Sequence, residues 1–118
     1  MSSFDDYCIA KNSQELTIKA KEIIRKLQEK IPGLVVEPVS SNEYVKLMTG
    51  TGDPAFACMK IKPGLGMIDF YMDHEAGNKI VSEPKHPGWN TKPYYIRVES
   101  QQPTDDIVET LYLAKEAF

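Results

Sequence analysis

The sequence predicts an α+β domain in which a mainly antiparallel sheet of four or five strands is covered on one face by an N-terminal and a C-terminal helix. Three observations carry this prediction. Apolar residues recur at helical spacing near both ends of the chain, and the middle of the chain alternates apolar and polar residues with period two. No repeat or linker-like stretch divides the 118 residues, so we expect a single domain over residues 1–118.

The clearest helical pattern lies between Asn12 and Gly33. Its apolar residues recur three or four positions apart, and they are Leu16, Ala20, Ile23, Ile24, Leu27 and Ile31. Asn12 with Glu15 three residues later predicts the start of this helix, and Pro32 followed by glycine predicts its end. We expect the charged residues of the opposite side, including Lys19, to be solvated and to form weak pairs four residues apart.

Short elements flank this helix. Residues 2–10, "SSFDDYCIA", are interpreted as a short helical arm whose Phe4, Tyr7 and Cys8 pack inward. The stretches 34–39 and 43–49 are rich in β-branched and aromatic residues, which predicts two strands. Pro38 lacks a backbone N–H, so the first of these strands belongs at a sheet edge or a bulge.

The stretch 55–72, "AFACMKIKPGLGMIDFYM", predicts a hairpin, because two alternating runs flank a turn with two glycines. Alternation resumes in "YYIRVES", which predicts a further strand. A final helix follows with Thr104 as its N-cap and with Asp105 and Asp106 in its first turn. Its apolar stripe consists of Ile107, Val108, Leu111, Ala114 and Phe118.

Composition narrows the class of protein. Apolar residues make up 42% and charged residues 26%, which is ordinary for a soluble globular domain. The net charge of −3 is too acidic for a broad, non-specific nucleic-acid binder. Cys8 and Cys58 have no metal-type spacing and cannot form a disulfide framework, and no apolar run could span a bilayer. We therefore expect a cytoplasmic protein with no membrane partner.

The second half of the chain resembles a known family in "FACMKIKPGLGMIDFYM", in the loop "HPGWNTKPYY", in "IRVES" and in the closing "AKEAF". These segments resemble the uncharacterised family called domain of unknown function 5655 and, more distantly, the YjbR/MmcQ-like proteins. The resemblance covers nearly the whole chain. Family members usually place a second glycine after the tryptophan, and "NTKPYY" departs from that pattern. The resemblance implies the same α+β fold and no particular activity.

Several motifs carry weak chemical signals. "GTGDPA" at 50–55 has the glycines of a dinucleotide-binding turn, but the sequence that follows it alternates like a strand, so we interpret it as a plain turn. "DHE" at 73–75 with His86 lacks the spacing of a zinc site. A nucleophile would require Cys8 or Cys58 beside a histidine, and nothing in the pattern activates either thiol. We predict no catalytic residue, no metal and no cofactor, and the enzyme hypothesis ranks third.

The most informative surface is the sheet face that the helices do not cover. If the alternation holds, Phe56, Lys62 and the strand residues of the candidate site project there, with the Trp89 loop near one end. The segment from Lys79 to Arg97 has four cations and one anion. The candidate site residues are Trp89, Arg97, Tyr95, Lys60, Tyr71, His86 and Lys92.

These residues predict a non-enzymatic binding module that recognises a protein partner or a small anionic ligand. The alternative is a protein that binds single-stranded nucleic acid or RNA through the same face, since aromatic rings stack bases and cations bind phosphates. A purely structural interpretation also remains open. In it, Asp69 and Glu99 pair with Lys60 and Arg97 across the strands, and Trp89 closes the edge of the core. The protein would be a monomer or a homodimer.

Overall fold

The fold was established from a computed structural model, which describes residues 4–39, 43–72 and 94–117. Its helices are α1 (Phe4–Lys11), α2 (Gln14–Lys30) and α3 (Thr104–Ala117). Its strands are β1 (Val35–Val39), β2 (Tyr44–Met48), β3 (Ala55–Lys62), β4 (Met67–Met72) and β5 (Tyr94–Glu99). A short 3₁₀ turn at Pro63–Leu65 joins β3 to β4.

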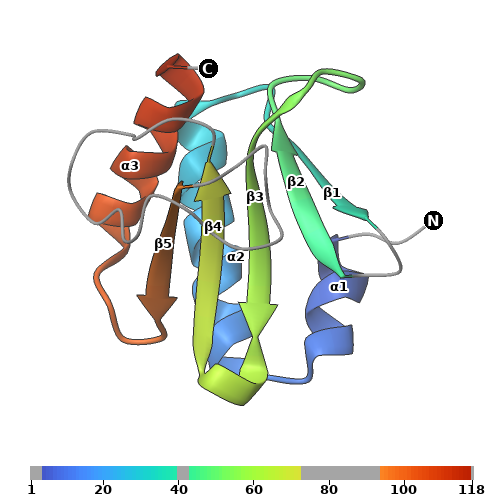
Figure 1. The fold of residues 1–118 in the computed structure, drawn as a ribbon, viewed down its shortest axis with the longest axis vertical. Helices are drawn as coiled ribbons and strands as arrows, with labels where there is room; N and C mark the ends of the chain where they lie inside the picture. The colour runs from blue at the N-terminus through green and yellow to red at the C-terminus, as the bar shows by residue number, and fades with distance from the viewer. Residues whose placement is uncertain (1–3, 40–42, 73–93, 118) are drawn as a thin grey trace.

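The five strands form one antiparallel sheet in the order β1-β2-β3-β4-β5. Figure 1 shows α2 and α3 packed on the same side of this sheet. The predicted α+β fold is therefore confirmed, and the short arm at the start of the chain forms a third helix, α1. Strand β1, which contains Pro38, lies at an edge as predicted. In the β3–β4 turn, Gly66 adopts a φ of +68°, which glycine tolerates best.

In the central strands, the two-residue alternation places Ile61, Phe70 and Ile96 on the core face, as the sequence predicts. Ile61 of β3, Phe70 of β4 and Ile96 of β5 are all buried in the hydrophobic core. The apolar stripe of α2 and the described part of the stripe of α3 meet them from the other side. This face of the sheet and the two helices thus enclose one core.

Phe56 is an exception to the predicted alternation. It was expected to project away from the helices, but it is only 1% exposed and belongs to the hydrophobic core. The cause is a break in register, because Leu47 pairs with Ala57 whereas Met48 pairs with Ala55. The extra residue of this β-bulge shifts the side-chain alternation by one position at Phe56.

Helix α1 lies against the edge of β3 near the start of β2 (Figure 1). The hydroxyl of Tyr7 accepts a hydrogen bond of 2.9 Å from the backbone N–H of Ile61. Burial raises the pKa of Tyr7 to about 12 in spite of this bond, so the hydroxyl stays protonated at ordinary pH.

Asn12 ends α1 in a left-handed conformation with φ of +53°. The N-cap of α2 is Ser13, so the prediction of Asn12 as that cap was wrong.

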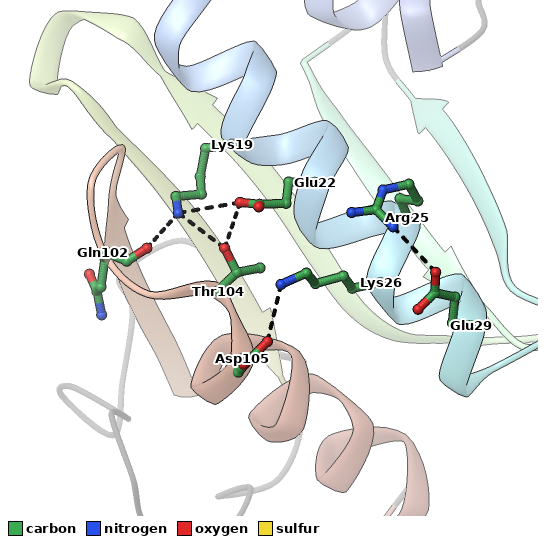
Figure 2. Close-up of polar contacts among 8 residues, drawn as sticks. All are labelled: Lys19, Glu22, Arg25, Lys26, Glu29, Gln102, Thr104 and Asp105. Carbon is green, nitrogen blue, oxygen red and sulfur yellow. Dashed lines mark hydrogen bonds and ion pairs between the residues drawn. The ribbon is translucent and has the colours of Figure 1, made fainter.

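A buried lysine joins α2 to the start of α3. Lys19 was expected to be solvated, but it is 8% exposed. Its ammonium group donates to the Gln102 carbonyl and, over 3.1 Å, to the Thr104 hydroxyl (Figure 2). The Thr104 hydroxyl in turn donates to Glu22 over 2.6 Å. Thr104 begins α3, but its hydroxyl bonds to α2 instead of acting as the predicted cap.

Candidate functional site

The far face is defined here as the sheet surface turned away from α2 and α3. The strand register brings its charged and aromatic side chains into two rows. One row crosses β2 to β5 as Lys46, Cys58, Tyr71 and Tyr95. The next row crosses β3 to β5 as Lys60, Asp69 and Arg97, and Lys62 follows Lys60 along β3. The far face therefore groups cations and tyrosines around one central carboxylate.

Asp69 is the centre of the far face and is fully buried. Arg97 binds it with two parallel hydrogen bonds, from Nε over 2.8 Å and from Nη2 over 3.0 Å. Lys62 lies 2.9 Å from the same carboxylate, and the Tyr71 hydroxyl donates to it over 3.0 Å. A buried carboxylate costs little when several donors satisfy it, and here three side chains do so.

These contacts set the charge state of the cluster. Burial alone would raise the pKa of Asp69, but the hydrogen bonds from Arg97 and Lys62 outweigh it, and the pKa lies below the usual value. Burial would likewise lower the pKa of Lys62, and the bond to Asp69 outweighs it, so this pKa is raised. The bond to Asp69 also raises the pKa of Arg97. All three side chains are thus charged at neutral pH.

Aromatic rings support the two cations of the cluster. The Lys62 ammonium lies 5.8 Å from the centre of the Tyr71 ring, and the Arg97 guanidinium lies 5.7 Å from that of Tyr95. The two tyrosine rings are 6.1 Å apart and tilted by 34°. Cation–π contacts of this kind hold a cation in place while one side stays open to solvent. Arg97 keeps 35% of its side chain exposed.

Lys60 occupies an unusual position within this arrangement. It lies directly opposite Asp69 in the register, yet Asp69 bonds to Lys62 and Arg97 instead. Among residues 4–39, 43–72 and 94–117, no carboxylate is within ion-pair distance of Lys60. In the purely structural interpretation Asp69 and Glu99 pair with Lys60 and Arg97, whereas in the structure Asp69 pairs with both Arg97 and Lys62.

The candidate residues differ in their exposure. Lys60, Tyr95 and Arg97 are half-buried, so each retains access to solvent. Tyr71 was expected to project from an exposed surface, but it is fully buried and its hydroxyl is bonded to Asp69. Cys58, which lies in the same row as Tyr71, is only 3% exposed. Tyr71 thus contributes a hydrogen bond to Asp69 and does not itself offer a contact surface.

Three candidate residues, Trp89, His86 and Lys92, lie outside the described residues, as do "DHE" at 73–75 and most of the basic segment 79–97. Their predicted roles stay predictions. Within the described part of the chain, no group of three or more His, Cys, Asp or Glu side chains could hold a metal ion.

The "GTGDPA" segment forms the turn between β2 and β3. The backbone N–H of Asp53 donates to the Gly50 carbonyl over 3.1 Å, and Gly52 adopts a φ of +86°. Strand β3 follows directly, so no helix N-terminus faces this turn. The interpretation as a plain turn is confirmed.

Sequence reasoning did not select one cation that the structure brings to this region. Lys62 was placed on the far face but not among the candidate residues, although it bonds to Asp69.

Comparison with protein-family models, with curated proteins and with solved structures found no match. The resemblance to the domain of unknown function 5655 therefore stays a prediction. None of the helices in the described part of the chain is both long enough and apolar enough to cross a bilayer.

Proposed function

We propose that this protein is a binding module that recognises an anionic group, on a protein partner or on a small ligand, through the far face and the Trp89 loop. The observation that supports it most is the position of Lys60. Lys60 is a half-buried residue of a central strand, and no carboxylate of the described residues lies within ion-pair distance of it, so its charge would favour an anion at this position.

The neighbouring contacts favour binding because they hold the cations in place beforehand. Asp69 fixes Arg97 through Nε and Nη2, and it also holds Lys62. Side chains that are already ordered lose little conformational entropy when a ligand arrives. The second Nη group of Arg97 is not engaged by Asp69 and would add a charge-assisted hydrogen bond.

The alternative, a reader of single-stranded nucleic acid, needs several exposed rings on which bases can stack. Of the three aromatic residues that were predicted to supply them, Phe56 and Tyr71 are buried and Tyr95 is half-buried. The arrangement therefore favours recognition of a compact anionic group over stacking of bases.

Calorimetric titration tests the proposal. The wild-type protein and the double variant Lys60→Gln/Arg97→Gln are titrated with a glutamate-rich peptide, with inorganic phosphate and with an oligothymidylate at low salt. We expect the peptide or phosphate to bind, and the double variant to lose about tenfold or more in affinity, because each charge-assisted hydrogen bond contributes about 1.5–3 kcal/mol. Trp89→Ala examines the contribution of the loop in the same way.

The matched control is Lys21→Gln/Arg25→Gln, which removes the same number of cations from the exposed side of α2. Equal loss in the control and in the far-face variant would mean that net charge alone drives binding, and the proposed surface would be wrong. Strong binding of the oligothymidylate alone would favour the nucleic-acid alternative.

A further inference from the structure

Two neighbouring hollows lie at one end of the sheet, where the β3–β4 turn, the end of β5 and the start of α2 come together (Figure 1). The hollow between the β3–β4 turn and the end of β5 has a volume of about 380 Å³. The hollow beside α2 has a volume of about 230 Å³. Ser100 and Gln101 line both, so the two hollows form one surface. We call this surface the end groove, and it is defined by Glu15, Ile18, Leu65, Glu99, Ser100 and Gln101.

The end groove exposes two large apolar side chains. Ile18 is 62% exposed and Leu65 is 57% exposed, although only three large apolar side chains are exposed in the part of the chain that the structure describes. Ile18 lies two residues from each of the buried Leu16 and Ala20, so helical periodicity turns it away from the core. Apolar side chains beside a hollow gain free energy when a partner removes them from water.

Each apolar side chain has a carboxylate beside it in the groove. Glu99 shares its hollow with Leu65, and Glu15 shares the other with Ile18. Both carboxylates belong to exposed residues. Within residues 4–39, 43–72 and 94–117, no lysine or arginine lies within ion-pair distance of either. The groove is therefore apolar and negatively charged at once.

Hydrogen bonds hold the segment between the two hollows in place. The Ser100 hydroxyl donates to Glu15 over 3.4 Å, which connects the turn after β5 to α2. Glu99 accepts the backbone N–H of Gln102 at its carbonyl over 3.1 Å, and its own N–H donates to the Gln102 side chain over 3.2 Å. A surface that is already ordered loses little conformational entropy when a partner binds.

We propose that the end groove docks a segment of a protein partner that combines apolar side chains with lysine or arginine. The apolar side chains would cover Ile18 and Leu65, and the cations would pair with Glu15 and Glu99. Charge complementarity selects this partner, because an acidic or purely apolar segment would cover both carboxylates without neutralising them. The end groove borders the far face at Glu99, but it lies apart from Lys60 and would take a partner of the opposite charge.

NMR titration of ¹⁵N-labelled protein with a synthetic octapeptide tests the proposal. The probe contains leucine and lysine in equal numbers, and two comparison peptides replace lysine by glutamate or leucine by serine. We expect the leucine-lysine peptide to shift the amides of Ile18, Leu65, Ser100 and Gln101, and to bind at least tenfold more tightly than either comparison peptide. The absence of such shifts at millimolar peptide, or tighter binding of the glutamate peptide, would overturn the proposal.

Substitution of the apolar residues provides the second readout. Ile18→Gln and Leu65→Gln should each weaken binding of the leucine-lysine peptide about tenfold, because each removes one aliphatic side chain from the contact. Both residues are exposed, so the fold should be retained. Ile9→Gln is the matched control, because Ile9 is 75% exposed on α1 outside the groove. An equal loss in Ile9→Gln would mean that the peptide adheres to any exposed apolar residue.

The carboxylates are tested in the same way. Glu15→Gln/Glu99→Gln should weaken binding about fivefold at low salt and make it less dependent on salt, as expected for two exposed ion pairs. Glu37→Gln/Glu43→Gln removes two exposed carboxylates elsewhere and should have a smaller effect. Equal losses in the two double variants would show that net charge alone attracts the peptide.

Two further results separate this proposal from its competitors. Lys60→Gln should not weaken binding of the peptide, so the proposed anion site and the end groove can fail independently. Sedimentation of the protein without peptide should show no self-association that Ile18→Gln or Leu65→Gln abolishes. If it does, the occupant of the groove is a second copy of the chain, and the proposed partner is wrong.

Discussion

Asp69 is the residue that organises the far face. It is fully buried, so its charge is acceptable only because Arg97, Lys62 and Tyr71 all donate to it. By engaging Lys62 in addition to Arg97, it leaves Lys60 without its cross-strand partner. The same carboxylate thus holds Arg97 and Lys62 in place and leaves Lys60 as the cation to which the proposed function assigns the anion.

Asp69→Asn should reduce stability by about 3 kcal/mol, at the low end for a broken buried ion pair because Arg97 and Lys62 keep some access to water. The wild type should also lose stability in acid. The folded-state pKa of Asp69 is lowered, so its contribution is complete above the unfolded-state pKa of about 3.9 and disappears as pH falls through the folded-state value.

Urea denaturation at neutral pH and at stepwise lower pH measures both effects. The variant should show a shallower decrease of stability below about pH 4, because it lacks this titrating group. Identical pH profiles for the two proteins would show that the ionisation of Asp69 does not cause the loss of stability in acid.

At this scale the sequence predicts which side chains share a face, but not which of them pair. Alternation places Asp69 and Arg97 on one face, and the strand register in the structure sets them opposite each other. The choice of Lys62 over Lys60 depends on a diagonal contact two residues along β3, which the twist of the sheet and the length of the lysine side chain decide.

Helix α2 contributes more than an apolar stripe. Lys19 lies three residues after Leu16 and four before Ile23, so its spacing places it on the buried side of the helix. It bonds there to Gln102 and Thr104, at the segment that leads from β5 into α3 (Figure 2). Helical spacing could have identified it, but its charge suggested a solvated position.

Lys19→Met tests this connection and has a close control in Lys26→Met. Both lysines reach from α2 to the start of α3, but Lys19 is 8% exposed, whereas Lys26 pairs with the exposed Asp105 (Figure 2). We expect Lys19→Met to cost about 1–3 kcal/mol, because it leaves the partly buried Gln102 carbonyl unsatisfied. Lys26→Met should cost less than about 1 kcal/mol, as exposed ion pairs do. Equal losses of stability in urea would contradict the structural role of Lys19.

The elements themselves were largely predictable, and the deviations occur at their ends and irregularities. Hydrophobic periodicity predicted α2, α3 and the strands β3, β4 and β5, and β-branched and aromatic composition predicted β1 and β2. Asn12 was mistaken for a cap because two helices meet in a turn too short to be recognised from composition. Phe56 was misplaced because a bulge depends on the partner strand, which local alternation does not report.

For the molecule as a whole, net charge is a poor guide to binding. The chain carries −3 overall, yet the far face combines four cations with three carboxylates, of which Asp69 is already neutralised. The cations are Lys46, Lys60, Lys62 and Arg97, and the other two carboxylates are Glu37, opposite Lys46, and Glu99 on β5. Because helices cover only one side of the sheet, charged side chains can gather on the far face, apart from the apolar core. The α+β fold followed from the sequence, whereas the full burial of Tyr71 and the choice of Lys62 as a partner of Asp69 did not.

Mapping of backbone amide shifts during titration of ¹⁵N-labelled protein with inorganic phosphate tests the central claim most directly. We expect the largest shifts at Lys60 and its neighbours on β3 and at Arg97 on β5, with little change along the exposed side of α2. In Lys60→Gln these shifts should be strongly reduced. Shifts concentrated on α2 and α3, or a pattern that persists unchanged in Lys60→Gln, would contradict an anion site on the far face.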